Sequence, residues 1–262
     1  MNESYSEYRG RLRLPSSPVI SIIMPNFNGE RFIAQAVESV LGQTFTNWEL
    51  IIIDDFSTDS STELITKFLC DSRIRLIKNS YNQGVAAARN IGIKHAEGQY
   101  ISFLDSDDTW QAEKLQKQYD LLNASEFWCS HTDFVEISEE GKILRSRTSP
   151  KIIKRSNLLL HNHIGNLSGL YDANFLGKHF QKPLMHEDYD MWLEILRKTD
   201  SIKPIGNLAS YRVRSSSLSS NKIKSILGHY RVLRGFQISA YVSVLFTFCH
   251  VCIKLGQKIG KY

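Results

Sequence analysis

Four consecutive residues near the middle of the chain are rich in carboxylates. Asp105-Ser106-Asp107-Asp108 directly follow the apolar run 100–104, which predicts a buried strand. Carboxylates packed this densely repel one another unless a cation or a hydroxyl ligand offsets their charge. Their hard oxygen atoms suit Mg²⁺ or Mn²⁺, which in turn bridge the oxygens of a diphosphate. The pattern equally fits an N-cap for a helix beginning near Trp110, because Asp caps helices well.

A second acidic group lies about eighty residues further along. His186-Glu187-Asp188 precede an amphipathic pattern that predicts a helix over 188–197. A carboxylate at this position suits a general base acting on a hydroxyl group. Acidic residues in a first helical turn also stabilise the helix dipole, so the pair alone leaves both interpretations open.

Apolar runs of strand length alternate with helical patterns over the first hundred residues. The period of the apolar residues predicts strands over 19–24, 48–53, 74–77 and 100–104, and helices over 32–41, from the cap at 59–63 to about 69, and over 85–95. Strands and helices alternating at these lengths imply right-handed βαβ units and a mainly parallel sheet.

Polar loops follow three of these strands. They are Asn26-Phe27-Asn28, Asp54-Asp55 and the acidic run at 105–108. Because ligands of open parallel sheets bind beyond the carboxyl ends of the strands, these loops are expected to share one ligand-binding edge. Beyond residue 111 the pattern changes: it predicts a strand over 127–137, a hairpin turn at 139–142 and a Ser-rich basic loop over 210–221.

The composition is that of an ordinary globular domain. Of 262 residues, 42% are hydrophobic and 23% are charged, with a formal net charge of +5. This mild charge suits a phosphate-bearing ligand or an anionic membrane surface, and no basic run of the nucleic-acid-binding type is present. The four cysteines form no disulfide framework or zinc pattern, and Cys249 and Cys252 lie in an apolar helical stretch. No signal peptide is visible at the start, so a reducing cytoplasm is expected.

Six motifs occur in order along the chain. They are SIIMPNFNGE at 21–30, SVLGQT at 39–44, WELIIIDDFSTD at 48–59, NQGVAAARN at 82–90, GQYISFLDSDD at 98–108, and Glu187-Asp188. This set resembles inverting glycosyltransferase family 2, in particular bacterial members that build surface polysaccharides such as O-antigen, capsule or lipooligosaccharide. The resemblance covers about residues 19–220. It implies an α/β GT-A fold, with one Rossmann-like nucleotide-binding domain, a mixed central sheet and a C-terminal helical extension.

The resemblance implies a donor site for a nucleotide-diphosphate sugar, with UDP as the expected nucleotide. Pro25 and Phe27 would frame the nucleobase, with Phe27 stacked on it, and Asp55 would accept a hydrogen bond from the uracil N–H. Arg89 would lie near the phosphates or orient the nucleotide loop. Asp105 would contact ribose or sugar hydroxyls.

The resemblance also assigns the chemistry. Asp107 would bind the divalent metal, Mn²⁺ or Mg²⁺, which offsets charge on the leaving diphosphate. Asp188 would deprotonate the acceptor hydroxyl on the opposite face of the sugar. In-line displacement then inverts the anomeric centre, and a hexose or N-acetylhexosamine passes to a saccharide acceptor, expected to be linked to a lipid diphosphate.

Two positions depart from the family pattern. Relatives often carry Tyr-Arg-x-His where this chain reads Tyr211-Arg212-Val213-Arg214, so a histidine ligand for the metal is in doubt. Arg214 is expected to clamp the diphosphate directly, because a guanidinium group matches phosphate oxygens bidentately. Phe56 occupies a position where relatives usually have Gly; it either narrows the uracil pocket or faces away.

Two other functions fit parts of this pattern. A sugar nucleotidyltransferase also uses a nucleotide, a metal and an α/β sheet, but it needs a Gly-rich phosphate loop with a basic residue early in the chain, which the loop at 26–29 lacks. A sugar-binding or scaffolding protein could keep the fold without catalysis. The presence of both Asp107 and Asp188 argues against that alternative.

The C-terminal segment differs from the rest. No residue from 236 to 253 carries a formal charge, and basic residues flank this stretch: Arg231 and Arg234 before it, Lys254, Lys258 and Lys261 after it. The stretch is short and only moderately apolar for a membrane span, so it predicts either an interfacial helix on anionic lipid or a helix packed on the domain. We therefore expect a tail at 1–17, a catalytic domain at 18–222 and a helical segment at 223–262 that contacts the inner face of the bacterial plasma membrane.

Overall fold

Four parallel strands form the centre of the molecule and confirm the predicted alternation. The protein is described by a computed structural model that covers residues 18–214 and 222–259, with only the backbone given for 222–224 and 253–259. The central strands are β1 (Ile20–Asn26), β2 (Trp48–Asp54), β3 (Ile74–Lys78) and β4 (Tyr100–Phe103), in the spatial order β3-β2-β1-β4. The predicted tail 1–17, most of the Ser-rich loop and Lys261 lie outside the described residues.

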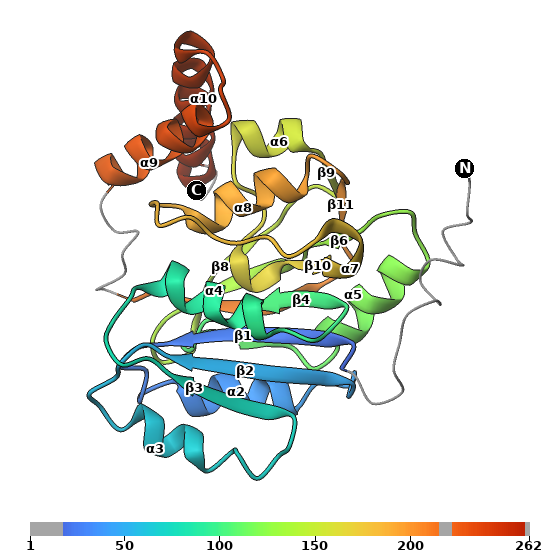
Figure 1. Ribbon diagram of the computed structural model, residues 1–262. Helices are drawn as coiled ribbons and strands as arrows, with labels where there is room; N and C mark the ends of the chain where they lie inside the picture. Colours follow the sequence, from blue (N-terminus) through green and yellow to red (C-terminus); the bar gives the residue numbers. More distant parts are fainter. Residues whose placement is uncertain (1–17, 215–221, 260–262) are drawn as a thin grey trace.

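Helices cover both faces of these strands (Figure 1). They are α2 (Ile33–Leu41) and α3 (Ser61–Thr66) on one face and α4 (Val85–His95) on the other. Successive side chains of a strand point to opposite faces. Ile22 and Leu50 accordingly pack in the cluster that contains α2, and Ile23 and Ile51 pack in the cluster that contains α4. Burial on both faces explains why the central strands read as continuous apolar runs.

Beyond β4 the sheet becomes mixed, as the family resemblance implied. β10 (Leu170–Asp172) pairs antiparallel with β4, and β6 (Cys129–Ser130), β11 (Ser201–Ile202) and β9 (Ile152–Ile153) complete eight strands. A second sheet has the order β5-β12-β7-β8. Its strands are β5 (Thr109–Trp110), β12 (Asn207–Arg212), β7 (Asp133–Ile137) and β8 (Ile143–Arg147).

The remaining helices surround this mixed region. They are α5 (Lys114–Asn123), α6 (Arg155–Leu160), a 3-10 turn η1 (Asn166–Ser168), α7 (Ala173–Leu176), α8 (Glu187–Ile195), α9 (Lys222–Gly235) and α10 (Ala240–Ile259). α9 and α10 form a helical hairpin beside α6 and α8 (Figure 1). Within the described residues, none of the helices has the length and apolar character required to cross a bilayer.

Three sequence-based boundaries were wrong. The predicted strand 127–137 is two strands in different sheets, because the chain leaves the large sheet at His131, whose ring bonds Ser201 Oγ and the carbonyl oxygen of Pro150. The helix expected to reach residue 69 ends at Thr66. The uncharged stretch 236–253 is not one helix, because a turn separates α9 from α10 and Gln237 adopts a left-handed φ of 59°.

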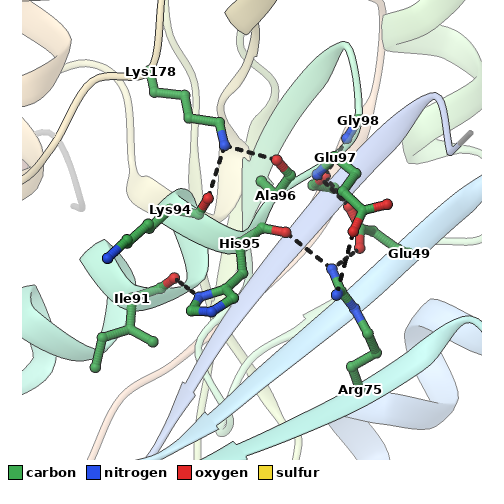
Figure 2. Close-up of polar contacts among 10 residues, drawn as sticks. Glu49, Arg75, Ile91, Lys94, His95, Ala96, Glu97, Gly98 and Lys178 are labelled. Atoms are coloured by element: carbon green, nitrogen blue, oxygen red, sulfur yellow. Dashed lines mark hydrogen bonds and ion pairs between the residues drawn. The ribbon is translucent and has the colours of Figure 1, made fainter.

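The C-terminal end of α4 is fixed by cationic side chains, as Figure 2 shows. Arg75 donates to the carbonyl oxygen of His95 and to Glu49, and Lys178 donates to the carbonyl oxygens of Lys94 and Ala96. Positive charge at this end of a helix is favourable because the last carbonyl groups lack intrahelical partners. The contacts fix the helix that carries Arg89.

Candidate active site

The loops after β1 and β2 are joined by hydrogen bonds at the carboxyl edge of the sheet. Asn26 donates to Asp54 Oδ1 over 2.8 Å, and the backbone N–H of Asn28 donates to Ser57 Oγ over 2.9 Å. The backbone N–H of Asp55 donates to the carbonyl oxygen of Asn26 over 2.8 Å. The predicted nucleobase residues therefore belong to one interlinked pair of loops.

The three residues predicted to bind the base have different exposures. Pro25 is buried within β1, whereas Phe27 lies just beyond the strand with 50% of its surface exposed. Asp55 is buried, and its carboxylate accepts bonds from Asn79 Nδ2 at 2.7 Å and from the backbone N–H of Gly84 at 2.8 Å. Phe27 thus offers an open aromatic face, and Asp55 holds the loop that leads into α4.

Phe56 has a left-handed backbone conformation, with φ of 68°, and is 50% exposed. Residues other than glycine rarely adopt this backbone conformation. This gives a physical reason for the glycine that relatives usually carry at this position. The structure leaves half of the phenyl surface open to solvent beside Asp55.

The acidic run after β4 is not a helix N-cap. Asp108 leads into the strand β5, and the next helix, α5, begins only at Lys114. Burial, followed by the charges of Asp107 and Asp105, raises the pKa of the Asp108 carboxyl well above its usual range. Burial and the charge of Asp105 also raise the pKa of Asp107, while Arg214 opposes this shift. This concentration of carboxylates is unfavourable without a cation beside it, and Asp107 and Asp105 both keep about a quarter of their side-chain surface open.

Arg89 connects the two acidic motifs. Its Nη2 lies 2.7 Å from Asp105 Oδ1 and its Nη1 lies 2.9 Å from Glu187 Oε1. Gln181 Oε1 accepts a third bond from Nη1 at 3.1 Å. The guanidinium group is almost fully buried. Burial opposes its charge, but Asp105 and Glu187 outweigh that effect and raise the pKa of Arg89. Asp105 and Glu187, which are 82 positions apart in the sequence, thus meet at one cation.

Asp188 follows Glu187 at the start of α8. Burial, with a further contribution from Glu187, raises the pKa of Asp188 to about 7, while Arg89 acts in the opposite direction. A general base is most effective when its pKa lies near the working pH, because it is then both deprotonated and sufficiently basic. Perturbed carboxylates of this kind concentrate at functional sites.

Arg214 lies at the same acidic run. Its Nη1 is 3.3 Å from Asp107 Oδ2, and about a third of its side-chain surface is exposed. A cationic side chain therefore occupies the sequence position where relatives often carry histidine, and it contacts the predicted metal ligand directly.

Sequence reasoning assigned no role of their own to three residues that shape the site, although Glu187 belongs to the acidic pair at the start of α8. Glu187 and Gln181 hold Arg89, as described above. Arg212 donates from its backbone N–H to Asp108 Oδ1 at 2.8 Å and from Nε to the carbonyl oxygen of Asp107 at 2.8 Å, so it fixes the acidic turn. The only signal for Arg212 in the sequence was its place in the Tyr-Arg-x-Arg motif.

Comparison with known proteins identifies the family of this chain. Residues 21–180 match the profile of Glycosyl transferase family 2. A relative from Escherichia coli, named UDP-Glc:alpha-D-GlcNAc-diphosphoundecaprenol beta-1,3-glucosyltransferase WfgD, is 37% identical over 93% of this chain and 96% of its own length. A second Escherichia coli relative with the same described activity, WfaP, is 35% identical over 88% of this chain and 91% of its own length.

Solved structures share the fold. The crystal structure of S. aureus TarS 1-349 in complex with UDP-GlcNAc has a TM-score of 0.70 at 18% identity, over 87% of this chain and 70% of that one. The mannosyltransferase PcManGT from Pyrobaculum calidifontis, in complex with GDP-Man and Mn²⁺, has a TM-score of 0.63 at 14% identity. The match covers 89% of this chain and 70% of that one. The profile match and the named relatives favour glycosyl transfer over the nucleotidyltransferase and scaffold alternatives. The chain belongs to glycosyl transferase family 2 and is a glycosyltransferase with the GT-A fold.

Proposed function

We propose that this enzyme transfers a hexose from a UDP-sugar to a hydroxyl group of a saccharide carried on a lipid diphosphate, with inversion of the anomeric centre. Two relatives that match most of this chain are named for transfer from UDP-Glc to GlcNAc-diphosphoundecaprenol, so UDP-glucose is the first donor to test. In bacterial cells such a reaction would serve surface-polysaccharide assembly at the cytoplasmic face of the plasma membrane.

The donor would bind across the carboxyl ends of β1, β2 and β4. The half-exposed ring of Phe27 is available to stack on uracil, and Pro25 supports the turn from within β1. Asp55 would accept the uracil N–H in addition to its bonds to the loop 79–84. Asp105 keeps part of its carboxylate surface open to ribose or sugar hydroxyls, while Arg89 holds that carboxylate in place from behind.

Asp107 would hold a divalent metal, Mn²⁺ or Mg²⁺. Its carboxylate is partly open, and burial and Asp105 raise its pKa, so a cation at this position would relieve the repulsion. Within the described part of the chain, no three His, Cys, Asp or Glu side chains come together as a complete metal site. That fits Mg²⁺ and its analogues, which commonly use one or two carboxylates together with substrate phosphates and water. The bound metal would offset the charge that develops on the leaving diphosphate.

Asp188 would act as the general base. Its carboxylate, with a pKa of about 7, would take the proton from the acceptor hydroxyl while the hydroxyl oxygen bonds to the anomeric carbon and the bond from that carbon to the diphosphate breaks. The observation that carries this proposal is Arg89, which joins Asp105 on the donor side to Glu187, the neighbour of Asp188. Donor and acceptor groups would thereby meet at a fixed separation.

The C-terminal hairpin would rest on the membrane. α10 shows an inverted pattern of burial: Ser243, Thr247 and His250 are buried against the protein, while apolar side chains face outwards. The outward residues and their exposures are Tyr241 at 91%, Val244 at 59%, Leu245 at 57% and Phe248 at 64%. A contiguous apolar face of this kind indicates an interaction surface. Basic residues on both sides of the uncharged stretch 236–253, together with the lipid-linked acceptors named for the relatives, favour an anionic lipid surface as the partner.

A transfer assay tests the proposal. The full-length protein, UDP-glucose, Mn²⁺ and a water-soluble GlcNAc-α-diphosphate with a short alkyl chain should yield a β-linked disaccharide and UDP, whose linkage NMR identifies. A parallel screen of UDP-galactose and UDP-N-acetylhexosamines tests the choice of sugar. UDP release without a new glycosidic product from any of these donors would contradict the proposed acceptor class.

A further inference from the structure

The residue before the predicted base has an unusual backbone conformation. His186 is the N-cap of α8 and has φ of 69° and ψ of 46°, in the left-handed region that residues other than glycine rarely occupy. Its carbonyl oxygen accepts the first helical hydrogen bond, from the N–H of Asp190 at 3.2 Å. The direction in which Glu187 and Asp188 leave the helix start therefore depends on this conformation being held.

Helix α9 holds it. His186 Nε2 lies 3.0 Å from the carbonyl oxygen of Ser225 and 3.2 Å from its Oγ. Because a carbonyl oxygen can only accept, Nε2 carries the proton and the imidazole donates to α9. The two segments also touch closely at Gly228, where an added Cβ would come within 2.8 Å of His186 Cδ2 and 3.1 Å of Met185 Cγ. A larger residue at 228 would therefore displace the side chain of His186 or α9 itself.

A second contact ties the hairpin to α8 on the other side of Asp188. Tyr189 OH donates to the carbonyl oxygen of Leu158 over 2.7 Å and lies 3.2 Å from His229 Nε2 on α9. The rings of Tyr189 and His229 stack, with centroids 5.2 Å apart and an angle of 10° between their planes. His229 in turn bonds Thr247 on α10 over 3.2 Å. The hairpin thus contacts residue 186 at the start of α8 and residue 189 within it, on either side of Glu187 and Asp188.

We propose that His186 is a positioning residue for glycosyl transfer, held in place by α9, so that docking of the C-terminal hairpin aligns Asp188 with the acceptor hydroxyl. This inference rests on the proposed role of Asp188 as the base. A base must lie within hydrogen-bond reach of the proton it takes, and a displacement of about 1 Å costs on the order of 10²-fold in rate. The hairpin that would contact lipid is therefore also part of the catalytic framework.

Two glycines on α9 provide a matched test. Gly228→Ala places a methyl group against His186, whereas at Gly235 an added Cβ meets nothing within 4 Å. Both changes should favour the helix, because Ala is a better helix former than Gly. We expect Gly228→Ala to lower kcat with the soluble acceptor by about tenfold or more, with UDP affinity, measured by calorimetry with Mn²⁺, within about twofold of the unmodified protein. Gly235→Ala should leave both unchanged. If the contact served only to stabilise the fold, Gly228→Ala would instead lower the melting temperature, and kcat and UDP affinity would change together.

A second pair addresses the backbone at 186 and decides the matter if Gly228→Ala is unstable. Asn tolerates the left-handed conformation far better than Ala does. His186→Ala should therefore lose more kcat than His186→Asn, with UDP affinity retained in both. Equal activity of His186→Ala, Gly228→Ala and the unmodified protein would overturn the positioning role. Full turnover by Asp188→Asn would overturn the proposed base itself. If Asp188→Asn is inactive and Gly228→Ala is fully active, the proposed function stands and only this inference is rejected.

Discussion

Arg214 Nη1 lies 3.3 Å from Asp107 Oδ2, so the protein neutralises its predicted metal ligand with a cation of its own. A divalent metal at Asp107 would displace this contact and leave the guanidinium group free to bind the donor diphosphate. A histidine at this position could ligate the metal. Arginine cannot ligate a metal, but it stays charged and presents a planar set of hydrogen-bond donors to phosphate.

The first prediction follows from this exchange of partners. Arg214→Ala should bind Mn²⁺ more tightly in the absence of nucleotide, by roughly threefold, because a competing cation is removed. The same variant should bind UDP about tenfold more weakly at saturating Mn²⁺, because charge-assisted bonds to the diphosphate are lost. Manganese paramagnetic resonance and calorimetry measure the two effects. The control is Arg197→Ala, at an exposed arginine whose ion-pair partner among the described residues is Glu194 on α8; it should change neither. If Arg214→Ala strengthened or weakened the binding of both Mn²⁺ and UDP, the exchange of partners would be contradicted.

The second prediction concerns stability around Asp107. Burial and neighbouring carboxylates raise the pKa of Asp107 and Asp108 above the unfolded value of 3.8. An acid whose pKa is higher in the folded state destabilises the fold as pH rises above the unfolded pKa, and the penalty is complete once pH exceeds the folded pKa. Asp107→Asn should therefore melt at a higher temperature than the unmodified metal-free protein at pH 7.5, with a smaller difference at pH 4. It should also lose transfer activity and the stabilisation by Mn²⁺.

A control separates this effect from a general change in charge. Asp120→Asn removes an exposed carboxylate on α5 that bonds only Gln116 among the described contacts, and it should alter neither the metal-free melting temperature nor the response to Mn²⁺. If Asp107→Asn still gained several degrees from Mn²⁺, the metal would bind elsewhere.

The third prediction concerns the pH dependence of transfer. Because Asp188 acts when deprotonated and has a pKa of about 7, kcat/KM should rise about tenfold per pH unit below pH 7 and level off above it. Glu187→Gln removes a carboxylate that raises this pKa, so the rise should move to lower pH. Asp188→Asn should lower kcat by about 10²-fold or more while UDP affinity stays unchanged. An unshifted profile in Glu187→Gln would mean that the rise reports another group.

Much of the fold could be predicted from the sequence because its central strands are buried on both faces. Such strands must be continuous apolar runs, and the helices between them must carry an apolar stripe, so β1, β2 and α4 were found with their boundaries nearly correct. The acidic residues after β4 were also found, because a parallel sheet brings loops from several strands to one edge.

The peripheral elements could not be predicted in the same way. Strands of two or three residues, such as β6 and β11, are too short to show any period, and their place in the sheet depends on pairing between distant segments. The partners of Arg89 were likewise out of reach, because Glu187 and Gln181 lie more than ninety positions away from it. His186 adopts its left-handed conformation beside α9, and its residue type does not predict that conformation.

The last prediction concerns the membrane surface of α10. Tyr241, Leu245 and Phe248 are exposed on its outward face, so their replacement by Ser leaves the buried side of the helix intact. We expect the full-length protein to float with vesicles containing anionic lipid at low salt and to dissociate as salt rises, because the contribution of each flanking cation, about 1 kcal/mol, is screened. The triple Ser variant should not float, should keep its melting temperature, and should lose activity on a long-chain lipid-linked acceptor while retaining it on the short soluble one. Ile205→Ser, which removes a highly exposed apolar residue between β11 and β12, serves as the control and should float normally. Deletion after Gly235 is a different experiment, because it also removes the contacts of Thr247 and His250 with His229 that support α8. That truncated protein should lose turnover on both acceptors. If the triple Ser variant floats as well as the full-length protein, α10 is not the lipid-binding face.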